Sequence, residues 1–210
     1  MAKKTCLTAV VILVALTSLN FGNYYIFDVP QELASAFLRF FDKTPADSEF
    51  LYTVYSAPAT VMALVSGFLI SWLTPTLTVV ICTYMIFLSA VCTMFGTHTK
   101  NYSFVLIGRV IYGIFAEPNQ ISQNTLVSEV FYGKFLSVAT GLSQVVNNLG
   151  LAGSNFLTGV FWLESRNMSV PFFWAAITCV ISFFGAVGWV IIEATGLNDK
   201  FKNSASKPKK

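Results

Sequence analysis

The chain has 210 residues, of which 55% are hydrophobic and 11% are charged, and its formal net charge is +3. Apolar runs of membrane-spanning length recur from one end to the other, which predicts an integral membrane protein without a separate soluble domain. The four cysteines lie inside apolar runs without C-x-x-C or metal-ligand spacing, so no disulfide framework, zinc site or other cofactor is indicated. The expected surroundings are a lipid bilayer, and no nucleic-acid partner is expected.

Six spanning helices are predicted, because one span needs roughly 20 apolar residues. The second and third are expected to be antiparallel neighbours, since the short connector Trp72 to Thr76 contains Pro75, which cannot continue a helix. The connector 31–49 should be an exposed loop with a short helical turn. Residues 1–197 are expected to form one domain, followed by a disordered lysine-rich tail at 198–210. The predicted spans are about 5–27, 50–73, 77–96, 102–129, 135–163 and 170–194.

The orientation is predicted from the Lys and Arg residues outside these spans. Eight lie on the side of the two termini and four on the other side, which favours cytosolic termini. The first span ends without a small-x-small cleavage site, so a retained helix is expected and not a cleaved signal peptide. Two N-x-S/T sequons, at Asn101 and Asn167, fall on the lumenal or extracellular side and are candidates for glycosylation. The expected membrane is lysosomal, another endomembrane or the plasma membrane.

Polar residues form stripes on three of the predicted helices, at about 100° per residue. These helices, the first, fourth and fifth, are expected to line a cavity. The second helix has a stripe of small residues that permits close packing, and the third and sixth are expected to be peripheral. The stripes are Thr17, Asn20, Tyr24, Asp28 and Gln31; Arg109, Gly113, Glu117, Gln120 and Asn124; and Ser137, Gly141, Gln144, Asn148 and Asn155. The candidate cavity residues are Asn20, Tyr24, Asp28, Arg109, Glu117, Gln120, Asn124, Gln144 and Asn148.

Two of these candidates are charged residues inside a predicted span. A charge at the bilayer centre costs about 2.5 to 3.5 kcal/mol, so Glu117 should face a partner or a watery cavity. Pro118 frees a backbone carbonyl beside it and suggests a bend. Glu117 is therefore predicted to be the ion- or proton-responsive residue. Arg109, about 12 Å away along the axis, is expected to meet Asp28 or a substrate carboxylate. The alternative is that Glu117 caps a neighbouring helix and Arg109 snorkels to the interface.

The chain also contains a short internal echo. The segment YIFDVPQEL, residues 25–33, is similar to GIFAEPNQI, residues 113–121. Each copy lies in the first helix of a block of three, and an odd number of helices inverts the second block relative to the first. The sequence thus predicts an all-α polytopic membrane fold of two inverted three-helix repeats.

Several of these motifs resemble one transporter family. The segment GRVIYGIFAEPNQISQNT at 108–125, FDVP at 27–30 and the ladder Gly141, Gly150 and Gly159 are similar to the major facilitator superfamily, and especially to its lysosomal dipeptide transporter-like branch. The resemblance covers about residues 23–162. It implies half of a major facilitator fold, the N-terminal six helices, and alternating access with helices 1, 4 and 5 around a central cavity.

Three features depart from that family. Its charged signature G-x-L-x-D-R-x-G-R is replaced at 67–75, where Ser71 stands in place of the acid and the basic residues are absent. Asn148 occupies a position where the dipeptide branch is expected to have a basic residue, which weakens the case for a substrate carboxylate there. Finally, this chain has six predicted helices where the family has twelve.

Two functions therefore remain open. The first is a transporter that moves a small polar solute, such as a peptide or amino acid, by alternating access, with the other half supplied by a second copy or another membrane protein. The second is a non-transporting structural or regulatory membrane subunit. An enzyme is not expected, because the helices contain no histidine, metal-spaced cluster or nucleophile–base pair.

Overall fold

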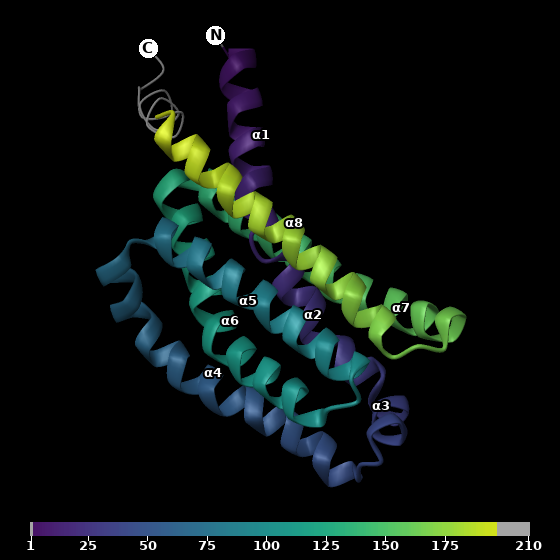
Figure 1. Ribbon diagram of the computed structural model, residues 1–210. Helices are drawn as coiled ribbons and strands as arrows, with labels where there is room; N and C mark the ends of the chain where they lie inside the picture. The colour runs from purple at the N-terminus through teal and green to yellow at the C-terminus, as the bar shows by residue number, and fades with distance from the viewer. Residues whose placement is uncertain (1, 197–210) are drawn as a thin grey trace.

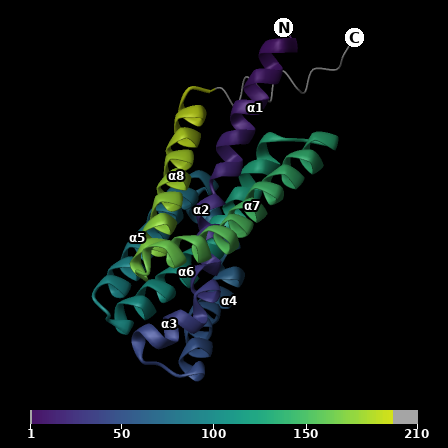
Figure 2. The same cartoon turned by 90° about the vertical axis from the view of Figure 1, so that its right-hand side faces the viewer.

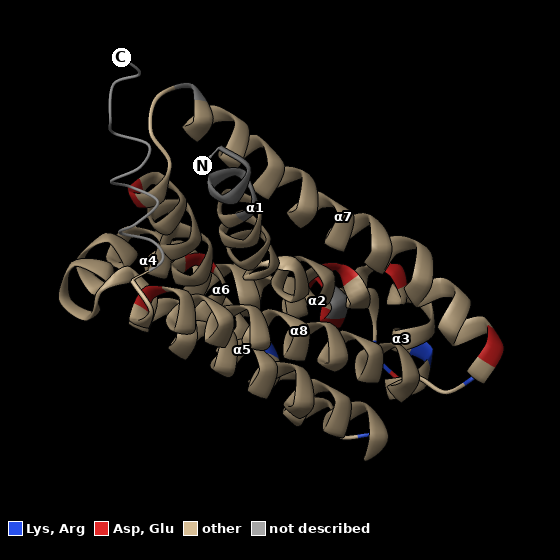
Figure 3. Ribbon diagram, turned by 90° about the horizontal axis from the view of Figure 1, so that it is seen from above, with Lys and Arg blue, Asp and Glu red and all other residues tan. Residues whose placement is uncertain are grey.

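A computed structural model describes residues 2–196, and every regular element in this range is an α-helix (Figure 1). The all-α prediction is confirmed for this range, while the predicted tail at 198–210 lies outside the described residues. Charged side chains are few, and most of the ribbon in Figure 3 is uncharged. The helices are α1 (Ala2–Ser18), α2 (Phe21–Glu32), α3 (Ala34–Phe41), α4 (Pro45–Leu73), α5 (Pro75–His98), α6 (Tyr102–Val130), α7 (Lys134–Ser165) and α8 (Ser169–Ala194).

The first predicted span is not one continuous helix. The span predicted at 5–27 is interrupted, because α1 ends at Ser18 and α2 begins at Phe21, although Thr8–Glu32 as a whole is long and apolar enough to cross a membrane. Backbone carbonyls at the break accept hydrogen bonds from side chains of other helices: Leu16 from Gln123 at 2.7 Å, Ser18 from Ser182 at 2.9 Å and Leu19 from Asn119 at 3.4 Å. These donors satisfy polar groups that would otherwise be unpaired in the membrane, so the break is tolerated.

The helix starts follow local signals in the sequence. Thr44 and Asp47 form a capping box at the start of α4, with Pro45 in its first turn. Thr74 lies between α4 and α5 and accepts a hydrogen bond from the Leu77 N–H. Asn101 accepts one from the Ser103 N–H at the start of α6. The predicted tight connector after α4 and the short helical turn inside 31–49, which is α3, are both present.

The helices pack in a defined order. α6 lies between α4 and α5, α8 packs on α5, and α2 lies between α7 and α8. Several of these contacts need a glycine. A Cβ atom at Gly22 would lie 2.6 Å from the Thr178 carbonyl oxygen of α8, and one at Gly113 would overlap the Tyr55 carbonyl of α4. These glycines bring α2 against α8 and α6 against α4 at backbone distance.

The apolar core is divided by a polar layer. One cluster contains Val29, Val105 and Phe172, and the other contains Ile12, Leu126 and Trp189. Along the chain, the buried carboxamides Asn20 and Asn119 fall between the two clusters on their helices. The break between α1 and α2 therefore lies in this polar layer.

Four segments are long and apolar enough to cross a membrane: Thr8–Glu32, Pro45–Leu73, Pro75–His98 and Ser169–Ala194. α6 and α7 are longer than a span requires but carry many of the polar residues, and six spans and the inverted repeat stay predictions. In both Figure 1 and Figure 2, the start of α1 and the end of α8 lie at one end of the bundle and α3 at the other.

Candidate functional site

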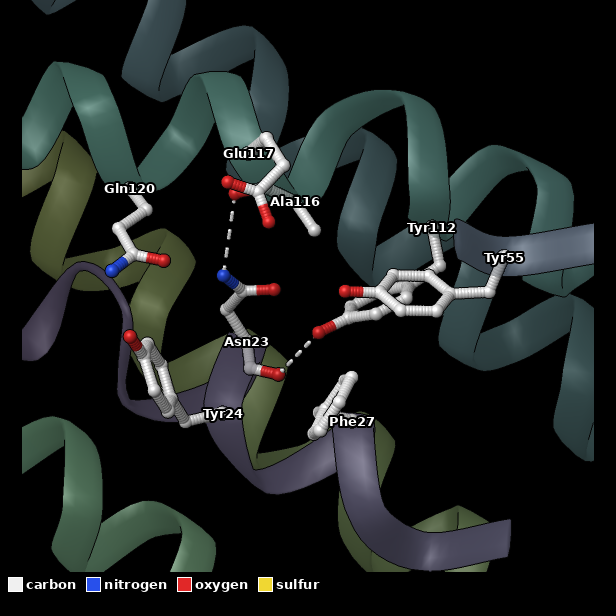
Figure 4. Close-up of a pocket in the computed structure, with 8 residues that line it drawn as sticks. All are labelled: Asn23, Tyr24, Phe27, Tyr55, Tyr112, Ala116, Glu117 and Gln120. Carbon is white, nitrogen blue, oxygen red and sulfur yellow. Dashed lines mark hydrogen bonds between the residues drawn. The ribbon is translucent and has the colours of Figure 1, made fainter. Parts of the chain in front are cut away.

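A cavity of about 200 Å³ lies between α2, α4 and α6 (Figure 4). Among the predicted site residues, Tyr24, Glu117 and Gln120 line it. The periodicity of helical side chains placed these three on inward-facing positions. The other lining residues were not predicted, and the complete lining is Asn23, Tyr24, Phe27, Tyr55, Tyr112, Ala116, Glu117 and Gln120.

Aromatic rings form one wall of this cavity. The ring centroids of Tyr55 and Tyr112 are 5.3 Å apart, and those of Phe27 and Tyr55 are 5.4 Å apart in an edge-to-face arrangement. The Tyr112 hydroxyl donates to the Asn23 carbonyl at 2.9 Å, and the Asn23 Nδ2 donates to the Ala116 carbonyl at 3.5 Å. These two hydrogen bonds connect α2 to α6 beside the cavity.

Glu117 supplies the only formal charge among the lining residues. Its side chain is half-buried and extends from α6 above Asn23 (Figure 4). Within residues 2–196 its carboxylate has neither a hydrogen bond nor an ion pair, so no contact supports the alternative that it caps a neighbouring helix. α6 runs through Pro118 as one helix. The carboxylate is therefore available to a proton or to a cationic group that enters the cavity.

Arg109 lies beside the cavity and does not line it. Its side chain is only 4% exposed, which contradicts the alternative of snorkelling to the interface. Both terminal nitrogens donate to the Phe27 carbonyl, at 3.3 and 3.4 Å, and the guanidinium carbon lies 5.8 Å from the Tyr112 ring centroid. Asp28 interacts with it electrostatically but forms no ion pair in the described chain. The expected contact between Arg109 and Asp28 is therefore not an ion pair in the described chain, and the guanidinium instead contacts the Tyr112 ring.

The residues Asn20, Asn23, Asn119, Gln123 and Asn147 form a buried group that we call the amide cluster. Asn20 Nδ2 donates to Gln123 Oε1 at 2.6 Å, and Asn119 Nδ2 donates to Asn20 Oδ1 at 2.6 Å. Asn147 Nδ2 donates to Gln123 Oε1 at 3.3 Å, which connects α7. Of the predicted site residues only Asn20 belongs to this cluster. The sequence signal for this cluster is the pair Asn119 and Gln123, which are four residues apart on one face of the helix. Each lies one position before a member of the polar stripe that was predicted for this helix.

The predicted residues of the fifth helix lie elsewhere. Gln144 is half-buried, and Asn148 is exposed, as is Asn124 on α6; none of them lines the cavity in this chain. The reason is that α7 buries a different stripe of residues, which packs on α1, α2 and α6. Its members are Ala139, Ser143, Asn147, Gly150, Ser154 and Thr158. At Gly150 a Cβ atom would lie 2.6 Å from the Phe21 carbonyl, so small residues set this face.

Both glycosylation candidates are exposed at helix starts. Asn101 precedes α6, and Asn167 accepts a hydrogen bond from the Ser169 N–H just before α8. Within residues 2–196 no group of three metal-ligating side chains is present.

The fold and the site together define a class of protein. Long apolar helices surround a cavity with an unpaired carboxylate and carboxamides, an arrangement typical of integral membrane proteins that bind solutes within the bilayer.

Comparisons with known proteins give the family. The model of the Major Facilitator Superfamily matches residues 7–210, so the chain belongs to this superfamily of membrane transporters. It is 25% identical over 190 residues to the lysosomal dipeptide transporter MFSD1 of Danio rerio, covering 85% of this chain and 41% of that protein. The corresponding proteins of Bos taurus and Homo sapiens are 26% and 25% identical, over 87% of this chain and 41% of each relative. The chain thus spans about two fifths of the length of these relatives.

Proposed function

We propose that this chain is half of a transporter that moves a small polar solute across a membrane by alternating access. The observation that carries the proposal is Glu117, an unpaired carboxylate in the cavity between α2, α4 and α6. Such a group is costly in a membrane unless it binds an ion or a substrate. Membership of a transporter superfamily supports the same function.

The names of the relatives suggest where to search for the solute and the membrane. Because the matched proteins are lysosomal dipeptide transporters, amino acids and dipeptides belong in a first substrate panel and the lysosome is the first compartment to examine. Uptake of a radiolabelled panel by reconstituted proteoliposomes with an imposed pH gradient tests the proposal. No uptake of any solute above that of protein-free vesicles would contradict it.

We infer that a second half closes the transport pathway. The exposed faces of α4 and α7 support this inference. Leu64, Phe68 and Trp72 on α4 and Phe135 and Phe156 on α7 are highly exposed. On α7 the polar residues Asn148 and Asn155 are exposed between such apolar residues. A polar side chain facing lipid is unfavourable, whereas a partner helix can pair with it.

We therefore expect two copies of the chain in each assembly. Mass photometry in lipid nanodiscs should give the mass of a dimer. Asn148→Trp, on the exposed face of α7, should shift the protein toward monomers, whereas the matched change Ile181→Trp, on an exposed apolar site of α8, should not. A wild-type protein that stays monomeric and folded, with no other membrane protein co-purifying, would contradict paired halves.

The proposal also includes the orientation. We infer cytosolic termini, because the lysine asymmetry predicts them and the start of α1 and the end of α8 lie at the same end of the bundle. An epitope tag after Lys210 should be accessible to antibody only after the membrane is permeabilised, and glycosylation should occur at Asn101 or Asn167. A tag that is accessible in intact cells would contradict this orientation.

The alternative, a non-transporting subunit, is supported by one observation. The connection from α4 to α5 lacks the charged signature of the superfamily, and Ser71 there is exposed and bonds only to the Gly67 carbonyl of its own helix. A subunit of this kind would form the assembly but give no uptake, so the two measurements together distinguish the candidates.

A further inference from the structure

The charges that line the cavity differ from those expected of a site that binds a zwitterion. The eight lining residues of the cavity include one carboxylate, Glu117, and no Lys, Arg or His. The side chains of Asn23 and Gln120 add neutral carboxamides. A solute that carries its own carboxylate would thus place a second negative charge beside Glu117 with no base among these eight residues to pair with it, which is unfavourable at low dielectric.

Arg109 does not provide that base. Its guanidinium is buried, donates to the Phe27 carbonyl and contacts the Tyr112 ring, and Arg109 is not among the residues that line the cavity. Asp28 also interacts with it electrostatically, although the two form no ion pair in the described chain. Other basic side chains in the described chain pack on aromatic rings outside the cavity: Lys43 on Tyr102, Lys100 on Phe40 and Arg166 on Trp162.

The walls of the cavity suit a cation. Four of its eight lining residues are aromatic, namely Tyr24, Phe27, Tyr55 and Tyr112. The face of an aromatic ring carries partial negative charge and attracts ammonium groups, especially where water is excluded. An aromatic wall opposite a carboxylate is a common arrangement for recognising a substituted ammonium ion.

One further group on the cavity has no partner. Asn23 is 5% exposed, and its Oδ1 is buried without a hydrogen bond in the described chain. In Figure 4 this oxygen points into the space between Glu117 and the tyrosine rings. A buried acceptor without a donor is costly, so a ligand with a hydroxyl or N–H group would satisfy it.

We propose that the cavity binds a compact organic monocation, an amine or quaternary ammonium that has a hydrogen-bond donor and no carboxylate. This inference rests on the proposed transport function and names the solute class for the same site. Glu117 supplies the counter-charge, the aromatic wall contacts the ammonium substituents, and Asn23 accepts the hydrogen bond. The volume of about 200 Å³ is below the roughly 300 to 1,000 Å³ of drug-sized sites, so the ligand is small.

The test is equilibrium binding to the full-length protein in nanodiscs with three probes of similar size. Choline is a hydroxylated monocation, 3,3-dimethyl-1-butanol has the same shape without the charge, and glycylglycine is a zwitterion. Choline should bind at least tenfold more tightly than either of the others. Equal binding of the neutral alcohol, or tighter binding of the dipeptide, would overturn the inference.

Variants of the lining residues test which side chains bind choline. Glu117→Gln should weaken choline binding at least tenfold, and Tyr55→Leu, which keeps the carboxylate, should weaken it about three- to tenfold. Glu129→Gln makes the same change at an exposed position near the end of α6 and should leave binding unchanged. If Glu117→Gln does not fold, Tyr55→Leu decides alone, and unchanged choline affinity there overturns the aromatic recognition.

Binding and transport can fail separately in this design. A protein that takes up other solutes but shows no preference for choline would overturn the solute class and leave the transport function standing. A protein that binds choline as described but moves no solute into proteoliposomes would overturn the transport function and leave the site standing.

Discussion

Glu117→Gln is expected to abolish the pH dependence of solute uptake, reducing the pH-driven component at least tenfold while the protein still folds and assembles. The carboxylate has no hydrogen bond or ion pair within residues 2–196, so the amide replaces it without breaking a contact. The other ionisable groups lining the cavity are the phenols of Tyr24, Tyr55 and Tyr112, and model phenols titrate only near pH 10. Glu117 is thus the only carboxylate among the residues that line the cavity, and this variant removes it.

Initial uptake rates over a pH series in proteoliposomes are the measurement. The charged residues nearest to this site, Arg109 and Asp28, are buried outside the cavity and are kept in both variants. Glu129→Gln, the same change on the same helix, should retain the wild-type profile because that residue lies near the end of α6 and is exposed. If Glu117→Gln transports with an unchanged pH profile, the carboxylate has only a structural role.

The second large effect concerns stability. Gln123→Leu is expected to destabilise the fold by about 2 to 4 kcal/mol, because this buried side chain makes three hydrogen bonds, to α1, to the break after it and to α7. Its loss leaves the Leu16 carbonyl, Asn20 Nδ2 and Asn147 Nδ2 without these partners. Each unsatisfied buried group costs about 1 to 3 kcal/mol in proteins generally, and interhelical bonds in membranes are worth about 0.6 to 2 kcal/mol.

Reversible unfolding by sodium dodecyl sulfate in mixed micelles, followed by tryptophan fluorescence, measures this loss. The next residue provides a matched control, because Asn124 is exposed and Asn124→Leu should change the unfolding free energy by less than about 0.5 kcal/mol. An equal effect of the two variants would show that the amide cluster does not hold α1, α6 and α7 together.

Much of the helical framework could be predicted from the sequence, because its causes are local. Apolar run length and composition specified membrane helices, and Pro75 marks a helix start that the structure also has, whereas α4 begins at Pro45, inside the connector that was predicted at 31–49. Three cavity residues, Tyr24, Glu117 and Gln120, were also predicted, since helical periodicity gives the direction of each side chain about the axis of its helix.

The tertiary structure decided what depends on which helices become neighbours. The break between α1 and α2 was not predicted, because the side chains that satisfy its free carbonyls, Asn119, Gln123 and Ser182, lie at least 100 residues away along the chain. The Arg109 side chain is buried between the helices because the Phe27 carbonyl lies within hydrogen-bond distance of it when α2 packs on α6. Periodicity alone does not say which of two adjacent polar stripes is buried. On α7 the choice depended on which face has residues small enough to meet the backbone of α2.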